Sequence, residues 1–320
     1  MNRWWRGAAL AFIAVFALAP ASDQVHATTV TANESGSSGI VLVAPTLAPT
    51  STTATQQLVQ SLDQLVARSP MTLTSSIEPL VAGSGASVGV SLIELGSSTP
   101  LVWSYNGHQV FTAASTYKLV ALMMEAESIA AGTVDPNGLV CYEDDDYEDG
   151  WFTDYEDGAC FTRNELASRA GQESDNTAGH MLVRDVGGAD AVNAWAASLG
   201  ASDSDFFNGN STSAIDLSIL WAAEARGALG GAAAQEWLYP FLTGTHTEAG
   251  VPAGVNGQSV VVHKTGTLDL IDNDAALVVS GPNGAYVLVV MTNNMGGDAG
   301  WQLIASISSA VWNFEAARAH

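Results

Sequence analysis

One short segment sets the layering of this chain. Residues 285–291 read Ala-Tyr-Val-Leu-Val-Val-Met, so an extended strand here would be apolar on both faces. A strand of that kind must be covered on both sides. Amphipathic patterns that can form the covering helices lie at residues 73–81, at residues 301–317 and from Tyr117 onward. The sequence therefore predicts three layers (α/β/α), with a sheet between two sets of helices.

Strand patterns of period two occur near both ends of the chain, while the region from about residue 117 to residue 255 is mainly helical in pattern. With 320 residues, of which 47% are apolar, the chain can bury a sizeable core. The expected fold class is α+β: a five-stranded antiparallel sheet made from both chain ends, flanked by helices, with a large helical insertion. The predicted strands are residues 88–92, 100–105, 259–263, 274–280 and 285–292.

The first 27 residues have the pattern of a secretory signal peptide. Arg3 and Arg6 precede an apolar run at residues 8–19, and small residues follow it. We predict cleavage after Ala27, with Ala21 as the second choice. An uncleaved anchor helix is the alternative, but about 12 apolar residues are too few to span a bilayer comfortably. We therefore expect a secreted, periplasmic or cell-surface protein that is not stably inserted in the membrane after the signal is removed.

Residues 28–55 are dominated by Thr, Ser, Ala and Pro, a composition that cannot bury enough apolar surface to fold alone. We interpret them as a flexible stalk. Leu58, Leu62 and Leu65 then share one helical face, so the folded domain is predicted to span residues 56–320 and to be a monomer.

The charge balance excludes one class of partner. Asp and Glu number 33 against 10 Lys and Arg, which gives a formal net charge of -23. Nucleic acid would be repelled, and an anionic membrane surface is an equally poor partner. Only two lysines occur, Lys118 and Lys264, so the position of each is informative.

Ser115 and Lys118 stand one helical turn apart, where the first strand pair leads into a long helical stretch. Residues at that spacing share a helical face. A deprotonated lysine amine can then take the proton of the serine hydroxyl, which makes the oxygen a nucleophile. A helix cap at Ser115 and a solvated Lys118 would give the same local pattern, so this motif needs support from elsewhere in the chain.

Two further motifs follow in the chain, and they are Ser174-Asp175-Asn176 and Lys264-Thr265-Gly266-Thr267. A second serine can pass a proton to a leaving nitrogen, and the Asn176 amide can hold both Lys118 and a substrate amide. Lys264 offers a cation to a substrate carboxylate, and Gly266 lets a substrate lie along the strand edge. A polar turn and an ordinary strand end are the structural alternatives. The probability that all three motifs occur in this order by chance is about one in ten thousand, so we favour the chemical interpretation.

These motifs are those of the penicillin-recognising serine hydrolases, and the chain resembles a class A β-lactamase over about residues 73–318. The resemblance implies a β-lactamase/transpeptidase-like fold that uses no cofactor. It implies that Ser115 is the acylated nucleophile, that Lys118 is its base and that Ser174 carries a proton. The backbone N–H groups of Ser115 and Thr267 would form the oxyanion hole. Residues around the motifs are also similar to those of the family, at Phe111, at residues 174–178, 210–217 and 251–255, and at His263.

The chain departs from the class A pattern at one catalytic position. Those enzymes carry a Glu, about 34 residues beyond the Ser-Asp-Asn motif, that activates the water for deacylation. Here no Glu occurs between Glu173 and Glu224, and residues 200–210 are too few for the usual loop. Asp203 and Asp205 are candidate replacements, although Asp reaches about 1.5 Å less far than Glu and a turn-capping role explains both residues as well. We expect acylation to outrun deacylation, with the lysine of the Ser-x-x-Lys motif as another candidate base.

Cys141 and Cys160 are the only cysteines, and in a chain predicted to be exported they are expected to form a disulfide. The stretch that they bound holds nine carboxylates within 20 residues. Part of it is similar to a calcium loop, but its glycine falls one place late. We interpret the stretch as a solvated acidic rim.

His246 and His263 prompt the question of a metal site near this chemistry. A zinc hydrolase needs convergent His ligands at a recognisable spacing, and that pattern is absent from the sequence. His263 precedes Lys264 on a predicted strand, so its side chain should face the opposite side of the sheet. No metal site is predicted, and His263 is expected to be a core or supporting residue.

Three functions of different kinds remain open. The first is an exported serine hydrolase that forms an acyl-enzyme with β-lactams. The second, in the same fold, is a D-Ala-D-Ala carboxypeptidase (a penicillin-binding protein) or an esterase that acts on cell-wall peptides or other acyl substrates. The third is a non-catalytic cell-wall binding module. The intact motif residues argue against the third. The missing Glu favours the second, and the Asp within the Ser-Asp-Asn motif favours the first.

Overall fold

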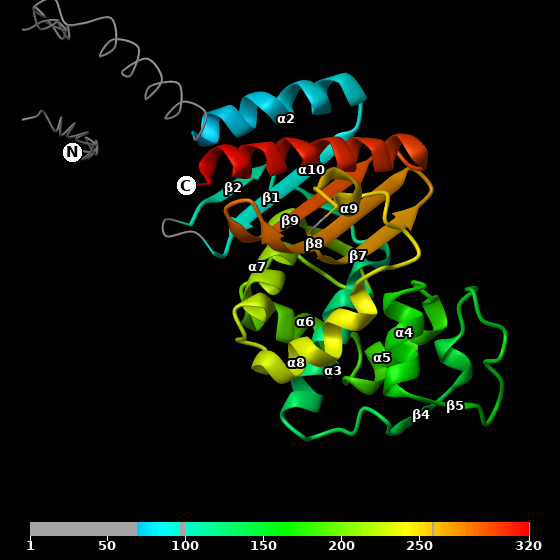
Figure 1. Ribbon diagram of the computed structural model, residues 1–320. Coiled ribbons are helices and arrows are strands. Elements are labelled where there is room, and N and C mark those ends of the chain that lie inside the picture. Colours follow the sequence, from blue (N-terminus) through cyan, green and yellow to red (C-terminus); the bar gives the residue numbers. More distant parts are fainter. Residues whose placement is uncertain (1–68, 97–99, 258, 320) are drawn as a thin grey trace, which may run out of the picture. The chain divides into compact units, whose positions relative to one another are not determined.

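The computed structural model describes residues 69–96, 100–257 and 259–319, and Figure 1 shows their course. The predicted signal peptide, the predicted stalk and the predicted helix at residues 56–68 lie outside the described residues. Within these described ranges, no helix is long and apolar enough to cross a membrane.

A five-stranded antiparallel sheet forms the centre of the fold, with the strand order β2-β1-β9-β8-β7. The first strand of the chain pairs with the last, so both chain ends build the sheet, and the predicted α+β architecture is confirmed. The strand bounds are β1 Ser87–Glu94, β2 Val102–Tyr105, β7 Val261–Leu268, β8 Ile271–Gly281 and β9 Gly284–Asn293.

Strand β9 is buried on both faces, as its sequence predicts. Leu288 and Val290 belong to one cluster of apolar side chains, and Val287 and Val289 belong to another. Full burial of a Leu or Val side chain stabilises a fold by about 1.5–3 kcal/mol. This one strand therefore joins two separate cores, one on each side of the sheet.

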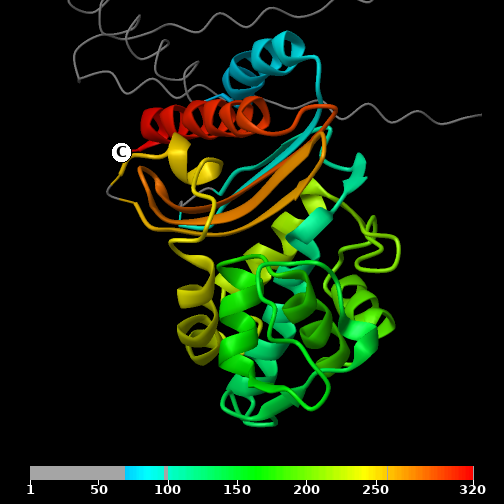
Figure 2. The ribbon, with the colours of Figure 1, turned by 90° about the vertical axis from the view of Figure 1, so that its right-hand side faces the viewer.

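One face of the sheet is covered by the helices α2 (Pro70–Ser84) and α10 (Asp298–Arg318), as Figure 2 shows, with the short helix α9 (Val251–Gly254) beside them. Leu73 of α2 and Ile304 of α10 are fully buried in this layer. The two predicted covering helices are thus present, and each is a few residues longer than its apolar pattern.

The helical insertion covers the other face (Figure 1). Its helix α7 (Ala214–Ala225) lies against the sheet, where the indole N–H of Trp221 donates to the carbonyl of Ala275 at 3.0 Å. Helix α3 (Tyr117–Ala130) is central to the insertion, and its residues 119–123 are fully buried. The other helices are α4 Arg163–Gly171, α5 Asn176–Asp185, α6 Ala189–Ser198 and α8 Gly231–Leu238. The 3-10 turns are η1 Ala114–Thr116, η2 Asp144–Asp146 and η3 Tyr239–Leu242. Two small antiparallel ladders pair β3 Val110–Thr112 with β6 Ser211–Ser213 and β4 Leu139–Cys141 with β5 Cys160–Thr162.

Strand β7 is longer than predicted. The apolar pattern ends at His263, but the ladder to β8 continues in register as far as the pair Leu268↔Ile271. Pairing of backbone groups, rather than side-chain hydropathy, extends the strand through the polar Lys-Thr-Gly-Thr motif. Lys264 therefore lies within the strand and not at its end.

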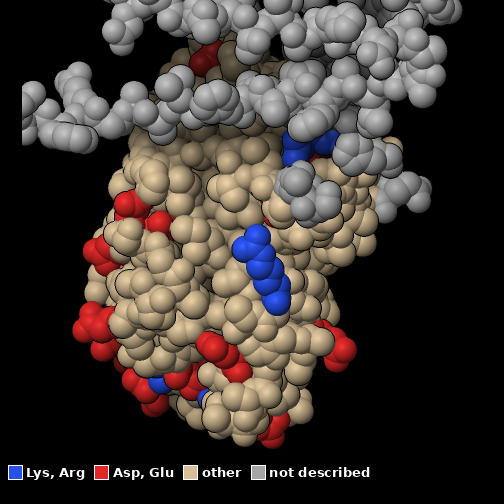
Figure 3. Space-filling view, turned by 90° about the vertical axis from the view of Figure 1, so that its left-hand side faces the viewer, with Lys and Arg blue, Asp and Glu red and all other residues tan. Residues whose placement is uncertain are grey.

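The surface reflects the acidic composition. On the face shown in Figure 3, acidic side chains gather along the margins and over the lower part, and much of the remaining surface is uncharged.

Candidate active site

Ser115 lies in the 3-10 turn η1, directly ahead of the central helix α3. Ala114, the residue before it, has a positive φ of 48°, a conformation that non-glycine residues adopt only under constraint from their surroundings. Lys118 follows one turn later, and its Nζ lies 3.0 Å from the Ser115 Oγ. The spacing of the motif thus produces the contact that the sequence predicts.

Lys118 is fully buried, and its amine is held by three oxygen atoms. Besides the serine hydroxyl, Nζ contacts the Ser174 carbonyl at 2.5 Å and the Asn176 Oδ1 at 2.7 Å. Burial lowers the pKa of Lys118 to about 7, although the negative charges of Asp175 and Glu148 oppose this shift. A large fraction of the amine is therefore neutral near pH 7 and able to accept a proton.

The middle residue of the Ser-Asp-Asn motif is structural. Asp175 caps helix α5, with Oδ1 accepting from the Ala178 N–H at 2.9 Å. Its two carboxylate oxygens also accept from the Tyr155 hydroxyl at 2.7 Å and from the Trp151 N–H at 2.9 Å. Asp175 therefore fixes the start of α5, where Ser174 and Asn176 face Lys118, and attaches the acid-rich stretch to that point.

Lys264 of β7 approaches the same serine from the sheet. Its Nζ donates to the Ser174 Oγ at 2.9 Å and to the Thr265 carbonyl at 2.8 Å. Burial and the nearby charge of Lys118 hold the pKa of Lys264 well below its usual range. Ser174 thus contacts Lys118 through its carbonyl and Lys264 through its hydroxyl.

Gly266 lets strand β7 pass close to Ser115. A Cβ at this position would lie 2.7 Å from the Ala113 carbonyl oxygen and 3.1 Å from the Ser115 backbone nitrogen. Only a residue without a side chain fits that gap. Thr267, two residues after Thr265, lines the cleft together with Ser115.

The cleft has two parts that meet at Ser115, Asn176 and Thr267. The first is a hollow of about 330 Å³, and the second is a hollow of about 350 Å³. The first is also lined by Trp151, Gln172, Glu173, Ser174, His246, Thr247, Thr265 and Trp301. The second is also lined by Ala114, Tyr117, Glu148, His180, Phe207, Asn210 and Leu268.

The structure does not bring Asp203 or Asp205 to this cleft, since neither lines either hollow. Asp203 Oδ2 lies 2.7 Å from the His108 Nδ1, and Asp205 Oδ1 accepts from the Asn193 amide at 3.0 Å. Both carboxylates are held by neighbours outside the cleft. Turn capping, the alternative role that the sequence suggests for both residues, fits these contacts better than a role as deacylation base.

His263 faces away from Lys264, as the strand pattern predicts. It is fully buried, with Nδ1 2.9 Å from Asp274 Oδ1 and Nε2 3.1 Å from Glu248 Oε1. Burial by itself would lower the pKa of His263, but the two carboxylates outweigh it and raise the pKa to about 9. His246 lies in the first hollow, with its ring 5.2 Å from that of Trp151. Among the residues that the structure describes, no group of three or more His, Cys, Asp or Glu side chains is placed to hold a metal ion.

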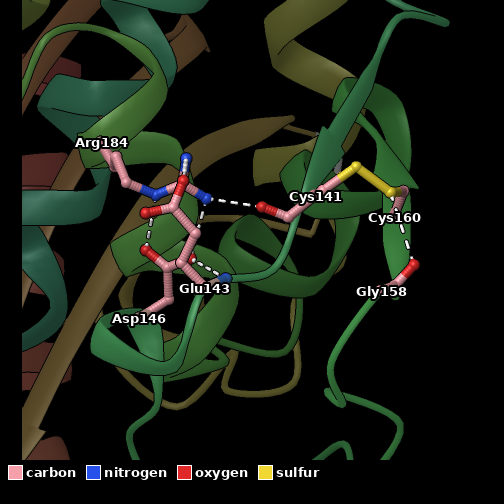
Figure 4. The surroundings of a disulfide bond; sticks show 6 residues. All are labelled: Cys141, Glu143, Asp146, Gly158, Cys160 and Arg184. Carbon is pink, nitrogen blue, oxygen red and sulfur yellow. Dashed lines mark hydrogen bonds and ion pairs between the residues drawn. A yellow bond between two sulfur atoms is a disulfide. The ribbon is translucent and has the colours of Figure 1, made fainter.

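The disulfide between Cys141 and Cys160 is present, as predicted, and it joins β4 to β5 (Figure 4). The idea of a solvated acidic rim is wrong for part of the stretch. Asp146 is buried and accepts from Arg184 at 2.8 Å, and the same guanidinium donates to the Cys141 carbonyl at 2.7 Å. Arginines of α4 and α5 neutralise several of these carboxylates, and this lets the stretch pack against the insertion.

Several residues of the cleft escaped the sequence analysis, and they are Tyr117, Glu148, Trp151, His180, Phe207 and Trp301. One of them carried a usable signal: His180 lies four residues after Asn176 and so shares its helical face. Glu148 carried none, because nothing local distinguishes it from the other acids of its stretch.

Ser115 paired with a buried, partly neutral amine, and Ser174 held between two lysines, lie in the fold of the class A β-lactamases and PBP-A. The profile of the beta-lactamase enzyme family matches residues 72–314, and the chain belongs to this family. No curated protein matches the chain by sequence.

Three solved structures illustrate the likeness. PBP-A is 26% identical, with a TM-score of 0.69 over 75% of this chain and 94% of that one. A single-residue mutant of PBP-A, solved as an acyl-enzyme complex with penicillin G, is 25% identical with a TM-score of 0.68 over 75% of this chain and 94% of that one. A beta-lactamase from Sphaerobacter thermophilus DSM 20745 has a TM-score of 0.67 at 23% identity, over 76% of this chain and 95% of that one, and shows the shared fold.

Proposed function

We propose that the protein is an exported serine hydrolase that forms an acyl-enzyme at Ser115 with β-lactams and hydrolyses them. The observation that carries this proposal is the 3.0 Å contact between the Ser115 Oγ and an amine whose pKa burial lowers to about 7. Such an amine is a suitable base near neutral pH.

In the proposed acylation, Lys118 takes the proton of Ser115 while Oγ bonds to the β-lactam carbonyl carbon. The carbonyl oxygen becomes an oxyanion that the N–H groups of Ser115 and Thr267 stabilise. The C–N bond of the ring then breaks, and the nitrogen takes a proton from the Ser174 hydroxyl, whose Oγ is reprotonated by the Lys264 amine 2.9 Å away. The proton that Lys118 has taken from Ser115 balances the one that Lys264 gives up. Every proton is thus accounted for, and the product is an ester on Ser115.

Substrate binding is assigned to the edge of β7. Lys264, with Thr265 and Thr267, offers charge and hydroxyl groups to the carboxylate of a penicillin. Although burial lowers the pKa of Lys264, a bound carboxylate would favour the charged amine. Asn176 is assigned the substrate amide.

The test is labelling with a fluorescent penicillin, followed by peptide mapping. The wild-type protein should carry one label, at Ser115, and Ser115→Ala should carry none. Lys264→Ala should need a higher penicillin concentration, because it removes a binding charge remote from the reacting bond. Labelling that persists in Ser115→Ala would refute the proposal.

A second function, D-Ala-D-Ala carboxypeptidase, is favoured by the lack of Glu between Glu173 and Glu224. Steady release of D-Ala from a cell-wall peptide ending in D-Ala-D-Ala would support this function. Steady hydrolysis of a chromogenic cephalosporin without such release would support the first. A non-catalytic binding module would show neither activity and no label.

Export is part of the proposal and rests on the basic, apolar and small-residue pattern of the first 27 residues. The mass of the protein recovered from its native host tests it. Loss of residues 1–27 is the expected result, and a mature chain that still begins at Met1 would contradict it.

A further inference from the structure

The second hollow of the cleft contains a carboxylate that the acylation steps do not use. Glu148 lines this hollow together with Ser115 and Asn176. It comes from the disulfide-bounded stretch between β4 and β5, and not from residues 200–210, which hold the candidate bases Asp203 and Asp205. The site therefore has a glutamate on the open side of its nucleophile, delivered by a different loop.

Side-chain contacts fix both oxygens of this carboxylate. Oε1 accepts from the Asn176 amide at 3.1 Å, and Oε2 lies 2.8 Å from the His180 Nε2. The backbone is held as well, because the Glu148 N–H donates to the Thr177 Oγ1 at 3.1 Å and the Thr177 hydroxyl donates to the Glu148 carbonyl at 2.8 Å. All three partners belong to α5, the helix that also positions the Ser-Asp-Asn motif.

The carboxylate lies close to the catalytic amine. Asn176 joins the two, since its Oδ1 accepts from Lys118 and its Nδ2 donates to Glu148. The charge of Glu148 raises the pKa of Lys118 against the effect of burial, and it raises the pKa of Tyr117 in addition to burial. The Glu148 side chain is 52% exposed, so solvent water reaches it.

His180 supports Glu148 without neutralising it. Burial lowers the pKa of His180, an effect that nearby Lys118 adds to and that Glu148 and Asp146 oppose, so the ring is less readily protonated than an ordinary histidine. A neutral ring donates a hydrogen bond from Nε2 and leaves the carboxylate its negative charge. The Phe207 ring, 4.9 Å away and edge-on, holds the imidazole in place.

Tyr117 also lines this hollow. The Tyr117 hydroxyl is buried and has no hydrogen-bond partner among the described residues. A buried hydroxyl of this kind is usually satisfied by an ordered water molecule.

We propose that Glu148 is the general base that activates water for hydrolysis of the acyl-enzyme, and that His180 is its positioning residue. The inference rests on the proposed acylation of Ser115. Glu148 takes a proton from the water as the water oxygen bonds to the acyl carbon. The bond from that carbon to the Ser115 Oγ then breaks, and Oγ takes the proton from Glu148 through the hollow. One water is consumed, and the free serine and a carboxylic acid are formed.

The experiment separates acylation from deacylation. Purified full chain is mixed with penicillin G, excess drug is removed, and intact mass is followed over time. Glu148→Gln should leave acylation at least as fast and should slow loss of the acyl group by about 10²–10⁴, the usual contribution of a general base. Asp145→Asn is the matched control, because it removes the same charge from an exposed position of the same stretch, and it should behave as wild type.

Two further variants test the roles. Glu148→Ala should deacylate as slowly as Glu148→Gln, and added formate should restore its rate, because a small carboxylate fits the vacated space. His180→Ala should slow deacylation only, and His180→Gln should recover part of the rate, since its amide keeps a donor near Nε2. A purely structural role would show no formate rescue.

The outcomes distinguish this inference from the proposed function. If wild type forms no acyl-enzyme, the proposed function fails and the inference fails with it. If the acyl-enzyme forms and Glu148→Gln or Glu148→Ala loses the acyl group at the wild-type rate, the inference alone is overturned and Lys118 becomes the base. Slow deacylation by Glu148→Ala that formate does not restore would likewise overturn it.

Discussion

The buried amine of Lys118 gives acylation a pH dependence. The proton must leave this amine before it can act as a base, and burial lowers its pKa to about 7. The second-order rate constant for acylation should therefore be low at pH 5, rise through pH 7 and level off above pH 8, as rapid mixing with a chromogenic cephalosporin would measure.

Lys118→Arg supplies the control for that profile. A guanidinium stays protonated at every usable pH, so this variant should lose about 10²–10⁴ in acylation rate without regaining activity at high pH. A wild-type rate that is flat between pH 5 and pH 9 would contradict the assignment of Lys118 as base.

Gly266 makes a second prediction at the residue scale. A methyl group there would lie 2.7 Å from the Ala113 carbonyl, so Gly266→Ala must push β7 away from the turn that carries Ser115. We expect a loss of about 1–3 kcal/mol in unfolding free energy and a larger loss of acylation rate. Gly83→Ala in α2 is the control, because nothing lies within 4 Å of its added carbon. Equal effects of the two changes in urea melts and labelling assays would count against the close approach.

At the scale of elements, the disulfide-bounded stretch carries Glu148, the proposed deacylation base. Closing a loop of about 20 residues stabilises a fold by about 3 kcal/mol in the chain-entropy model. Replacing Cys141 and Cys160 together with Ala should therefore lower the unfolding free energy by about that amount. The acyl-enzyme should also last longer, since Glu148 lies in the stretch.

Urea denaturation and acyl-enzyme lifetime measure the two effects separately. The ion pairs between Arg184 and Asp146 and between Arg169 and Asp154 remain in the double variant, so the stretch should keep its general course. An unchanged lifetime together with lost stability would show that these ion pairs, and not the disulfide, position Glu148.

The net charge acts on the whole molecule. At -23, repulsion among surface carboxylates opposes the compact state. Salt shortens the Debye length from about 30 Å at 0.01 M to about 10 Å at 0.1 M and so weakens this repulsion. The melting temperature should rise as sodium chloride is added in this range. A fall would mean that local pairs such as Arg318 with Glu94 outweigh the repulsion.

The layering and the site motifs were accessible from the sequence. Apolar residues at alternate positions, or on both faces of a strand, predicted the sheet strands, because the spacing of apolar residues along a strand depends on local backbone geometry alone. Ser115 and Lys118 meet because one helical turn separates them, so that contact too is local.

The features that the sequence did not predict depend on contacts between distant parts of the chain. The end of β7 depends on pairing with β8, which no side-chain pattern within the strand records. Likewise, Asp203 and Asp205 lie near the family position of the missing Glu in sequence, but their contacts with His108 and Asn193 hold them outside the cleft.

The sequence by itself therefore determined the sheet, the covering helices and the contact between Ser115 and Lys118. Only the tertiary structure decided which of nine similar carboxylates faces the nucleophile. Glu148 reaches the cleft because Asn176, Thr177 and His180 of α5 bind it across about 30 residues of chain. Contacts of that range depend on how separate elements pack, and packing is a property of the folded molecule as a whole.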